Sequence, residues 1–262
     1  MGTIEPHLDE LYHLRSMIVD CCERCDGAGY VLDEDGDDST CSCMQVFRYV
    51  IRLVVANIPR DYWHLFWKEL NVGKAVKKLL SRYFDNFSIA AERGLGILFL
   101  GANGVGKTAL MCEIGKHALV HGRTVLYFTN DRYITALQRN DDVFLRQVED
   151  SQVLLLDEVE KAYSRDGGTF VPKKTEALLR SSLSLGRIVV MATNYPEEDL
   201  TEMFGESTMS LLRRRLKFVP VVGQDRSVDL QDRWTETLTT TYDFMHPHIV
   251  EQAAVLHQFE ME

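Results

Sequence analysis

The chain has 262 residues, of which 45% are hydrophobic and 26% charged, which is enough for one substantial domain with small appendages. Its formal net charge of −10 argues against a broad, nonspecific grip on nucleic acid, but it leaves room for a local basic track. No apolar run approaches the ~20 residues that span a bilayer, and Met1 to Glu10 has no signal-peptide pattern, so we expect a cytoplasmic protein without a membrane partner.

Residues 1–50 form the first expected unit, which is rich in cysteine. Two close pairs with 15 residues between them offer four thiolates, Cys22, Cys25, Cys41 and Cys43. Four thiolates at this separation suit a tetrahedral zinc ion, and the glycines after Cys25 are similar to a zinc-ribbon knuckle. Cys21 is an alternative ligand in a shifted register, and redox-active thiols or an iron–sulfur cluster are the competing interpretations. The sequence therefore predicts a small zinc-ribbon-like module that depends on its metal for folding.

Residues 51–95 are expected to link this module to a larger domain. Apolar residues recur at three- and four-residue spacing from Val76 to Phe87, which predicts one amphipathic helix that ends at Gly94 and Gly96.

Short apolar runs then alternate with helical segments. Strands are expected at 97–100, 124–129, 153–156, 188–192 and 218–222, and a helix from Thr108 to Leu119 follows the first strand. This alternation predicts an α/β domain over residues 96–230, with a parallel sheet sandwiched between helices.

The first strand leads directly into a phosphate-binding loop. The pattern G-x-x-x-x-G-K-[ST] is matched at every fixed position, and the expected nucleotide contacts are Gly101, Asn103, Gly104, Val105, Gly106, Lys107 and Thr108. The glycines let backbone amides turn toward phosphate oxygens, and the next helix presents its positive end to the anion. We expect Lys107 to reach the β and γ phosphates of ATP and Thr108 to ligate Mg²⁺.

Polar residues follow two later strands. The third strand runs into Asp157 and Glu158, and we expect Asp157 to hold Mg²⁺ through water and Glu158 to act as general base toward the attacking water. The fourth strand ends near Asn194, which is expected to position that water. A helix cap or turn is the alternative role for Asn194, because Tyr195 and Pro196 follow it.

Three consecutive arginines, Arg213, Arg214 and Arg215, precede the fifth strand. They cannot all share one helix face, so one or two are expected to project into the ATP site of a neighbouring subunit and stabilise charge during phosphoryl transfer. A solvated basic face is the alternative.

In this order, the segments GANGVGKT, LLLDE, ATN and RRRLKF resemble the AAA+ ATPases of the DnaC/DnaI helicase-loader and IstB transposition-helper group, over about residues 55–230. Ala56-Asn-Ile-Pro-Arg60 and the short segment ending at Arg226 add softer similarities. The resemblance implies a P-loop AAA+ three-layer sandwich, Mg²⁺-dependent ATP hydrolysis and self-association through the ATP sites. It makes Arg215 the preferred catalytic arginine and Arg214 the next, and it likens Arg226 to a second sensor.

The same resemblance implies single-stranded DNA binding by helices between the second and third strands. Arg132, Arg139 and Arg146 lie there with Tyr133, and their seven-residue spacing puts the arginines near one face if the helix is continuous. Asn140 to Asp142 predicts a break in that helix, and a solvated face is the alternative interpretation.

Partners and function also follow from the resemblance. It implies that the N-terminal module binds a hexameric replicative helicase of the DnaB type, and the acidity of that module favours a protein partner over nucleic acid. The expected function is ATP-dependent loading of this helicase onto single-stranded DNA during DNA replication. An IstB-like transposition helper is one alternative, and a nucleotide-gated protein-binding module with little turnover is the other.

Residues 231–262 form the expected C-terminal tail. His246 and His248 are either metal ligands or, more commonly for such residues, solvated side chains. The helical spacing of Ile249, Ala253, Leu256 and Phe259 predicts a short helix that docks on the chain's own core or on a partner.

Overall fold

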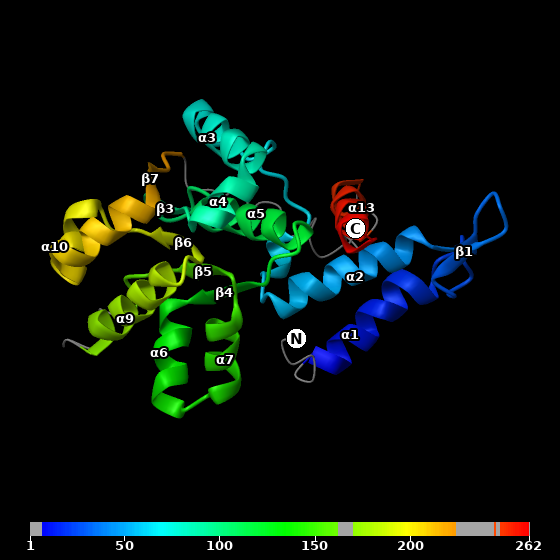
Figure 1. Ribbon diagram of the computed structural model, residues 1–262, viewed down its shortest axis with the longest axis horizontal. Coiled ribbons are helices and arrows are strands. Elements are labelled where there is room, and N and C mark those ends of the chain that lie inside the picture. Colours follow the sequence, from blue (N-terminus) through cyan, green and yellow to red (C-terminus); the bar gives the residue numbers. More distant parts are fainter. Residues whose placement is uncertain (1–6, 162–169, 224–243, 245–246, 262) are drawn as a thin grey trace.

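The computed structural model of the chain describes residues 7–161, 170–223, 244 and 247–261 (Figure 1). Arg226 and His246 lie outside these residues. Among the described helices, none has both the length and the apolar character that crossing a bilayer requires.

A five-stranded parallel sheet forms the centre of the larger domain. Its strands are β3 (Gly96–Leu100), β4 (Val125–Thr129), β5 (Val153–Asp157), β6 (Ile188–Thr193) and β7 (Leu216–Pro220). Their spatial order is β4-β5-β6-β3-β7, and every neighbouring pair is parallel. The five expected strands are confirmed, although the last begins two residues earlier than expected because Leu216 already pairs with Gly96. This order brings the carboxyl ends of β5, β6 and β3 together at one edge, where ligands of such sheets bind.

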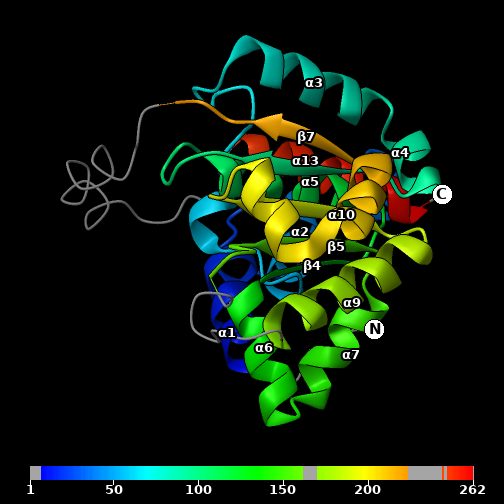
Figure 2. The ribbon, with the colours of Figure 1, turned by 90° about the vertical axis from the view of Figure 1, so that its left-hand side faces the viewer.

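Helices cover both faces of the sheet, which gives the three expected layers (Figures 1 and 2). Successive strand residues alternate between the layers: Ile97 and Phe99 pack with α5 (Lys107–Val120), whereas Leu98 packs on the opposite side. The opposite layer consists of α6 (Asn130–Arg139), α7 (Asp142–Asp150), α9 (Phe170–Ser184) and α10 (Glu197–Arg215). The strands are apolar on both faces because both faces are covered.

The helix expected from Val76 to Phe87 is two helices, so that prediction is wrong in its continuity. α3 spans Lys74–Asp85 and α4 spans Phe87–Arg93. They are separated at Asn86, whose backbone leaves the helical region. The side-chain amide nitrogen of Asn86 donates to the Arg82 carbonyl oxygen. Gly94 ends α4 in the left-handed conformation, as its position suggested, and a Cβ there would lie 2.6 Å from the Gly186 oxygen.

The N-terminal residues form an arm that extends away from the sheet (Figure 1). The arm begins with α1 (Leu8–Arg15), the π-helical turn η2 (Ser16–Asp20) and the antiparallel hairpin of β1 (Tyr30–Leu32) and β2 (Asp38–Thr40). The chain then leads toward the core through α2 (Ser42–Val55) and the 3₁₀ turn η3 (Arg60–Tyr62). The boundary expected at residues 50 and 51 falls inside α2, which packs against α5 of the core.

The C-terminal tail contains the expected helix, α13 (Pro247–Met261), and it packs against the chain's own α2 and α5. Ile249, Ala253 and Leu256 are buried in this contact. His248 is also buried, with its ring centroid 4.1 Å from that of Phe66, so the expectation of a solvated side chain is wrong for this residue. Its ring packs against Phe66, which lies in the segment before α3.

Candidate functional site

The loop after β3 has the backbone that a phosphate cradle needs. Gly104 and Gly106 have φ values of 73° and 96°, a region that side chains with a Cβ rarely enter. A Cβ at Gly101 would lie 2.3 Å from the Val221 oxygen, so only glycine fits there. Gly106 caps α5, whose first residues are Lys107 and Thr108. The loop therefore presents backbone amides and a helix N-terminus at the carboxyl edge of the sheet.

Lys107 is folded into this loop. Its Nζ donates to the carbonyl oxygens of Gly101 at 2.8 Å and Ala102 at 2.6 Å, and to Asn194 Oδ1 at 2.8 Å. Burial lowers the pKa of Lys107, while the carboxylates of Asp157 and Glu160 oppose that shift. The ammonium group is thus held where phosphate oxygens would compete for it.

Thr108 and Asp157 face each other. Thr108 Oγ1 donates to Asp157 Oδ2 at 2.8 Å, and the Glu158 amide donates to Asp157 Oδ1 at 2.9 Å. Burial raises the pKa of Asp157, although these hydrogen bonds favour its charged form. A hydroxyl and a carboxylate in contact are oxygen ligands that fit Mg²⁺.

Glu158 has an unusual backbone. Its φ is 53°, a left-handed value that costs a non-glycine residue about 1–2 kcal/mol. Its carboxylate forms an ion pair with Lys161, three residues later. The expected general base is therefore held by a cation in this structure.

Asn194 lies against Lys107 and not at a helix cap, since Pro196 is the N-cap of α10. The side chain and amide of Asn194 both donate to Glu160, a buried residue to which the sequence assigned no role. The sequence Asp157-Glu158-Val159-Glu160 could have indicated a role for Glu160. An acid two residues after Glu158 is expected to lie beside the same strand ends.

Two tyrosines also approach the Thr108–Asp157 pair and were not expected there. The Tyr127 hydroxyl donates to Asp157 Oδ2 at 2.9 Å. Tyr62 approaches Thr108, and burial raises the pKa of Tyr62 to about 12. Position in β4 gave a signal for Tyr127, because the tyrosine interrupts the apolar run of this strand and packs on the α5 side of the sheet. Tyr62 comes from a segment whose path the sequence did not indicate.

The three arginines lie at the amino ends of the strands, opposite the phosphate loop. Arg215 ends α10 just before β7, and its Nη1 donates to the Arg93 carbonyl at 2.6 Å. Arg213 forms ion pairs with Glu197 and Glu206. Arg214 is exposed, and its Nε contacts only the Ser210 carbonyl, at 3.3 Å, among the residues that the structure describes. Because β3 starts beside Arg215 and ends at the phosphate loop, these arginines do not reach their own site.

The expected arginine-and-aromatic surface is only partly formed. Asn140 has a φ of 53° and separates α6 from α7, so the arginines do not share one continuous helix. Arg132 pairs with Asp141 at 2.6 Å and lies 4.3 Å from the ring centroid of Phe144. Tyr133 is buried in the core, so it is not available for stacking on a base. The exposed arginines of this surface that lack a carboxylate partner among the described residues are Arg139 and Arg146.

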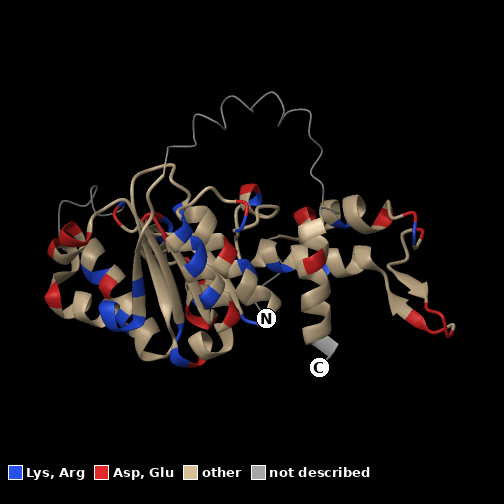
Figure 3. Cartoon of the chain, turned by 90° about the horizontal axis from the view of Figure 1, so that it is seen from above, with Lys and Arg blue, Asp and Glu red and all other residues tan. Residues whose placement is uncertain are grey.

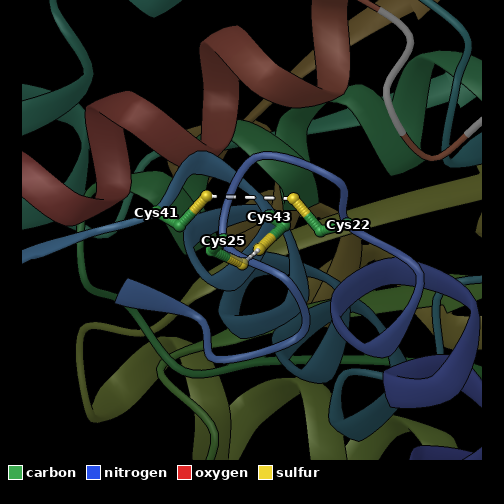
Figure 4. A group of neighbouring side chains, drawn as sticks. All are labelled: Cys22, Cys25, Cys41 and Cys43. Atoms are coloured by element: carbon green, nitrogen blue, oxygen red, sulfur yellow. Dashed lines mark hydrogen bonds between the residues drawn. The ribbon is translucent and has the colours of Figure 1, made fainter. Parts of the chain in front are cut away.

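Four cysteines converge in the N-terminal arm (Figure 4). The sulfurs of Cys22, Cys25, Cys41 and Cys43 all lie within 4.8 Å of one another. The Cys22–Cys41 and Cys25–Cys43 sulfur separations are 3.9 Å and 3.5 Å. A tetrahedral ion with Zn–S bonds near ~2.3 Å separates its sulfurs by about 3.8 Å. The four thiols therefore have the arrangement of a zinc site.

The backbone around these thiols supports that arrangement. The Gly29 amide donates to Cys25 Sγ at 3.2 Å, as in the expected knuckle. Burial opposes ionisation of Cys25, but this hydrogen bond and those to the other thiols lower its pKa to about 7. Cys21 is exposed and its Sγ contacts the Met17 carbonyl, so the shifted register is wrong.

Comparison with known proteins agrees with this geometry. Residues 73–223, more than half of the chain, match the family described as IstB-like ATP binding protein. A curated Pseudomonas aeruginosa protein, described as an ATP-binding protein of insertion sequence IS21, is 30% identical over 128 residues. That match spans 45% of this chain and 45% of the relative's length.

Solved structures share the fold. The DnaC helicase loader has a TM-score of 0.52 at 21% identity, with 63% of this chain and 100% of that chain covered. DnaI has a TM-score of 0.52 at 17% identity, with 64% and 93% covered. With its P-loop AAA+ fold, the chain belongs to the IstB-like ATP-binding protein family.

Proposed function

We propose that the chain hydrolyses ATP in a Mg²⁺-dependent reaction at the loop after β3. The supporting observation is that Lys107, the Thr108–Asp157 pair and Asn194 meet at one edge of the sheet. Thr108 and Asp157 would hold Mg²⁺, which offsets phosphate charge when bound. The oxygen of a water molecule attacks the γ phosphorus, the bond to the β–γ bridging oxygen breaks, and ADP leaves. Glu158 takes the proton of the water once it separates from Lys161.

Neighbouring subunits complete each other's sites in this proposal. Arg215 is the first candidate for the arginine that acts across the boundary, by its place in Arg-Leu-Lys, and Arg214 is the second, by its exposure. Support comes from their position at the end of the sheet opposite their own phosphate loop, which places them away from that loop. Mixing Lys107→Ala subunits with Arg215→Ala or Arg214→Ala subunits tests this. Activity regained on mixing supports action in trans, and none regained with either arginine variant contradicts it.

The four-thiol module is proposed to bind zinc and to dock a hexameric replicative helicase of the DnaB type. Its hairpin carries exposed apolar side chains, with Tyr30 50% and Leu32 71% exposed, beside an acidic tip (Figure 3). Exposed apolar residues rimmed by charge are typical of protein-binding surfaces, and the acidity favours a basic protein surface over nucleic acid. Helix α2 joins this module to the core, so docking there can be linked to the nucleotide state.

We therefore infer that the chain is an ATP-dependent loader that places the helicase on single-stranded DNA during replication. Arg139 and Arg146 are the proposed DNA contacts of α6 and α7. The proposed division is a zinc module at 1–50, a linker at 51–95, the ATPase core at 96–230 and the tail at 231–262, in a cytoplasmic protein. Helix α2 continues from the module into the linker.

A transposition helper is the second candidate, and the insertion-sequence relative favours it. Purifying the chain with a hexameric helicase of the DnaB type, and separately with a transposase on duplex DNA, separates the two. A stoichiometric helicase complex that Cys25→Ser abolishes supports the loader. A complex with the transposase and duplex instead would exclude it.

Turnover is tested by measuring ATP hydrolysis with and without single-stranded DNA, for the parent and for Glu158→Gln. We expect the parent to turn over and the variant to lose about 100-fold or more in rate. If the parent binds ATP but shows no turnover in either condition, the chain is a nucleotide-gated binding module and not an enzyme.

A further inference from the structure

Glu160 is a buried carboxylate that the proposed reaction does not yet use. It is 5% exposed. Its Oε2 accepts from Thr193 Oγ1 at 2.8 Å, and its Oε1 accepts from Asn194 Nδ2 at 2.7 Å and from the Asn194 amide at 3.2 Å. A buried carboxylate costs several kcal/mol unless donors satisfy it. All three of these donors come from the carboxyl end of β6, so their hydrogen bonds hold the Glu160 carboxylate beside that strand end.

The side chain of Asn194 lies between two opposite charges. Its amide nitrogen donates to Glu160, and its Oδ1 accepts from Lys107 Nζ at 2.8 Å. A carboxylate only accepts hydrogen bonds and an ammonium group only donates them. The two neighbours therefore permit one orientation of the Asn194 amide, with the oxygen toward the phosphate loop.

The backbone around Glu160 is fixed from three sides. The Val159 amide donates to the Ala192 carbonyl at 3.3 Å, and the Val159 carbonyl accepts from Asn130 Nδ2 at 2.7 Å. Asn130 Oδ1 in turn accepts from Thr175 Oγ1 at 2.9 Å. These buried groups tie the segment to β6, α6 and α9, so Glu160 is held in place by packing as well as by its own hydrogen bonds.

We propose that Glu160 is a positioning residue that orients Asn194 for the ATP reaction, an inference that rests on the proposed function. In this structure the Lys107 ammonium donates to Asn194 Oδ1. A bound triphosphate draws the Lys107 ammonium to its own oxygens, and Oδ1 is then free to accept a hydrogen bond from the attacking water. The second N–H of the same amide is left to donate to the γ phosphate.

The substitution Glu160→Gln tests this without emptying the site. Glutamine keeps the size and can still bond Thr193 and Asn194, but it no longer dictates which end of the amide faces the loop. We expect kcat to fall about tenfold or more with KM changed by less than about twofold. We also expect preference for a non-hydrolysable ATP analogue over ADP to shrink, with affinity for ADP and the melting temperature unchanged.

A double-mutant cycle separates positioning from general structure. In an Asn194→Ala background, Glu160→Gln should have no further effect, because its only route to the reaction is removed. Additive losses would overturn the proposal, as would equal losses of ATP-analogue and ADP affinity together with a lower melting temperature. Glu176→Gln is the matched control, since Glu176 also accepts from a threonine, Thr208, but lies outside the site. If the parent has no turnover, the proposed function fails, and the comparison of ATP-analogue with ADP affinity still decides the role of Glu160.

Discussion

The Tyr127 hydroxyl and the Asp157 carboxylate are joined by a hydrogen bond of 2.9 Å, to the same oxygen that accepts from Thr108. This bond connects the edge strand β4 to the proposed magnesium site. It also favours the charged form of Asp157, against the burial that raises its pKa.

Tyr127→Phe is expected to weaken Mg²⁺ binding. Loss of the donor raises the pKa of Asp157 further, so protons compete better with the metal as the pH falls. The Mg²⁺ concentration for half-maximal ATP binding should rise about three- to tenfold, with a larger effect at pH 6 than at pH 8. A titration at both pH values checks this. Tyr133→Phe, at a buried tyrosine outside the site, is the control, and an equal effect in that variant would contradict the prediction.

Asp157→Asn is expected to stabilise the metal-free chain. Because burial raises the pKa of Asp157 above its ordinary value, the folded state holds its proton more tightly than the unfolded state does. This carboxyl therefore costs stability as the pH rises from about 4 through its raised pKa, and the cost persists at pH 7. Melting temperatures in EDTA should be higher for the variant, while added Mg²⁺ and ATP should stabilise only the parent. A lower melting temperature in EDTA would contradict this.

Lys116→Met is expected to be strongly destabilising. Lys116 is fully buried, pairs with Glu113 and donates to the carbonyls of Tyr62 and Trp63. Removing one partner of a buried pair leaves an uncompensated charge and costs about 3–5 kcal/mol. Urea unfolding measures it. The double variant with Glu113→Gln should recover part of the loss, because the remaining charge is removed as well.

His117→Phe is expected to reduce acid sensitivity. Burial, and then the neighbouring His121, lower the pKa of His117 to about 3. Since the unfolded chain binds a proton near pH 6.5, stability is lost as the pH falls below that value, by up to about 1.4 kcal/mol for each pH unit. Urea midpoints at pH 7.5 and 5.5 should differ more for the parent than for the variant. An equal difference in both would show that other groups dominate.

Metal removal is expected to unfold the N-terminal arm and spare the core. The cysteine cluster supplies four thiolates to an arm with little core of its own, so a strong chelator should remove about one zinc per chain and much of the arm's stability. Elemental analysis and amide hydrogen exchange over residues 8–40 check this. Cys21→Ser should leave the metal content unchanged, whereas Cys25→Ser should reduce it. A chain that is purified without zinc and keeps exchange protection in the arm would contradict the prediction.

Much of the site could be read from local order. The phosphate loop, Asp157 with Glu158, Asn194 and the paired cysteines follow from residue type and short spacing, because glycine backbones, strand ends and thiolate pairs impose their chemistry locally. The strands could also be predicted from the sequence, because a strand that is covered on both faces is a continuous apolar run. The break at Asn86 could not be predicted in this way. Apolar periodicity favours one continuous helix, but a hydrogen bond from the Asn86 side chain to the Arg82 carbonyl competes with it.

What the sequence by itself determined is the kind of fold, the nucleotide loop and the set of zinc-type ligands, each encoded within a short stretch. Only the tertiary structure decided that Glu160 accepts hydrogen bonds from Asn194, that Tyr62 and Tyr127 approach Thr108 and Asp157, and that Arg132 forms an ion pair with Asp141. It also placed the C-terminal helix on α2 and α5. The reason is physical: apart from the Arg132–Asp141 pair, which joins two consecutive helices, these contacts join elements far apart in the chain. Strand order and helix packing bring such elements together, and no local pattern specifies them.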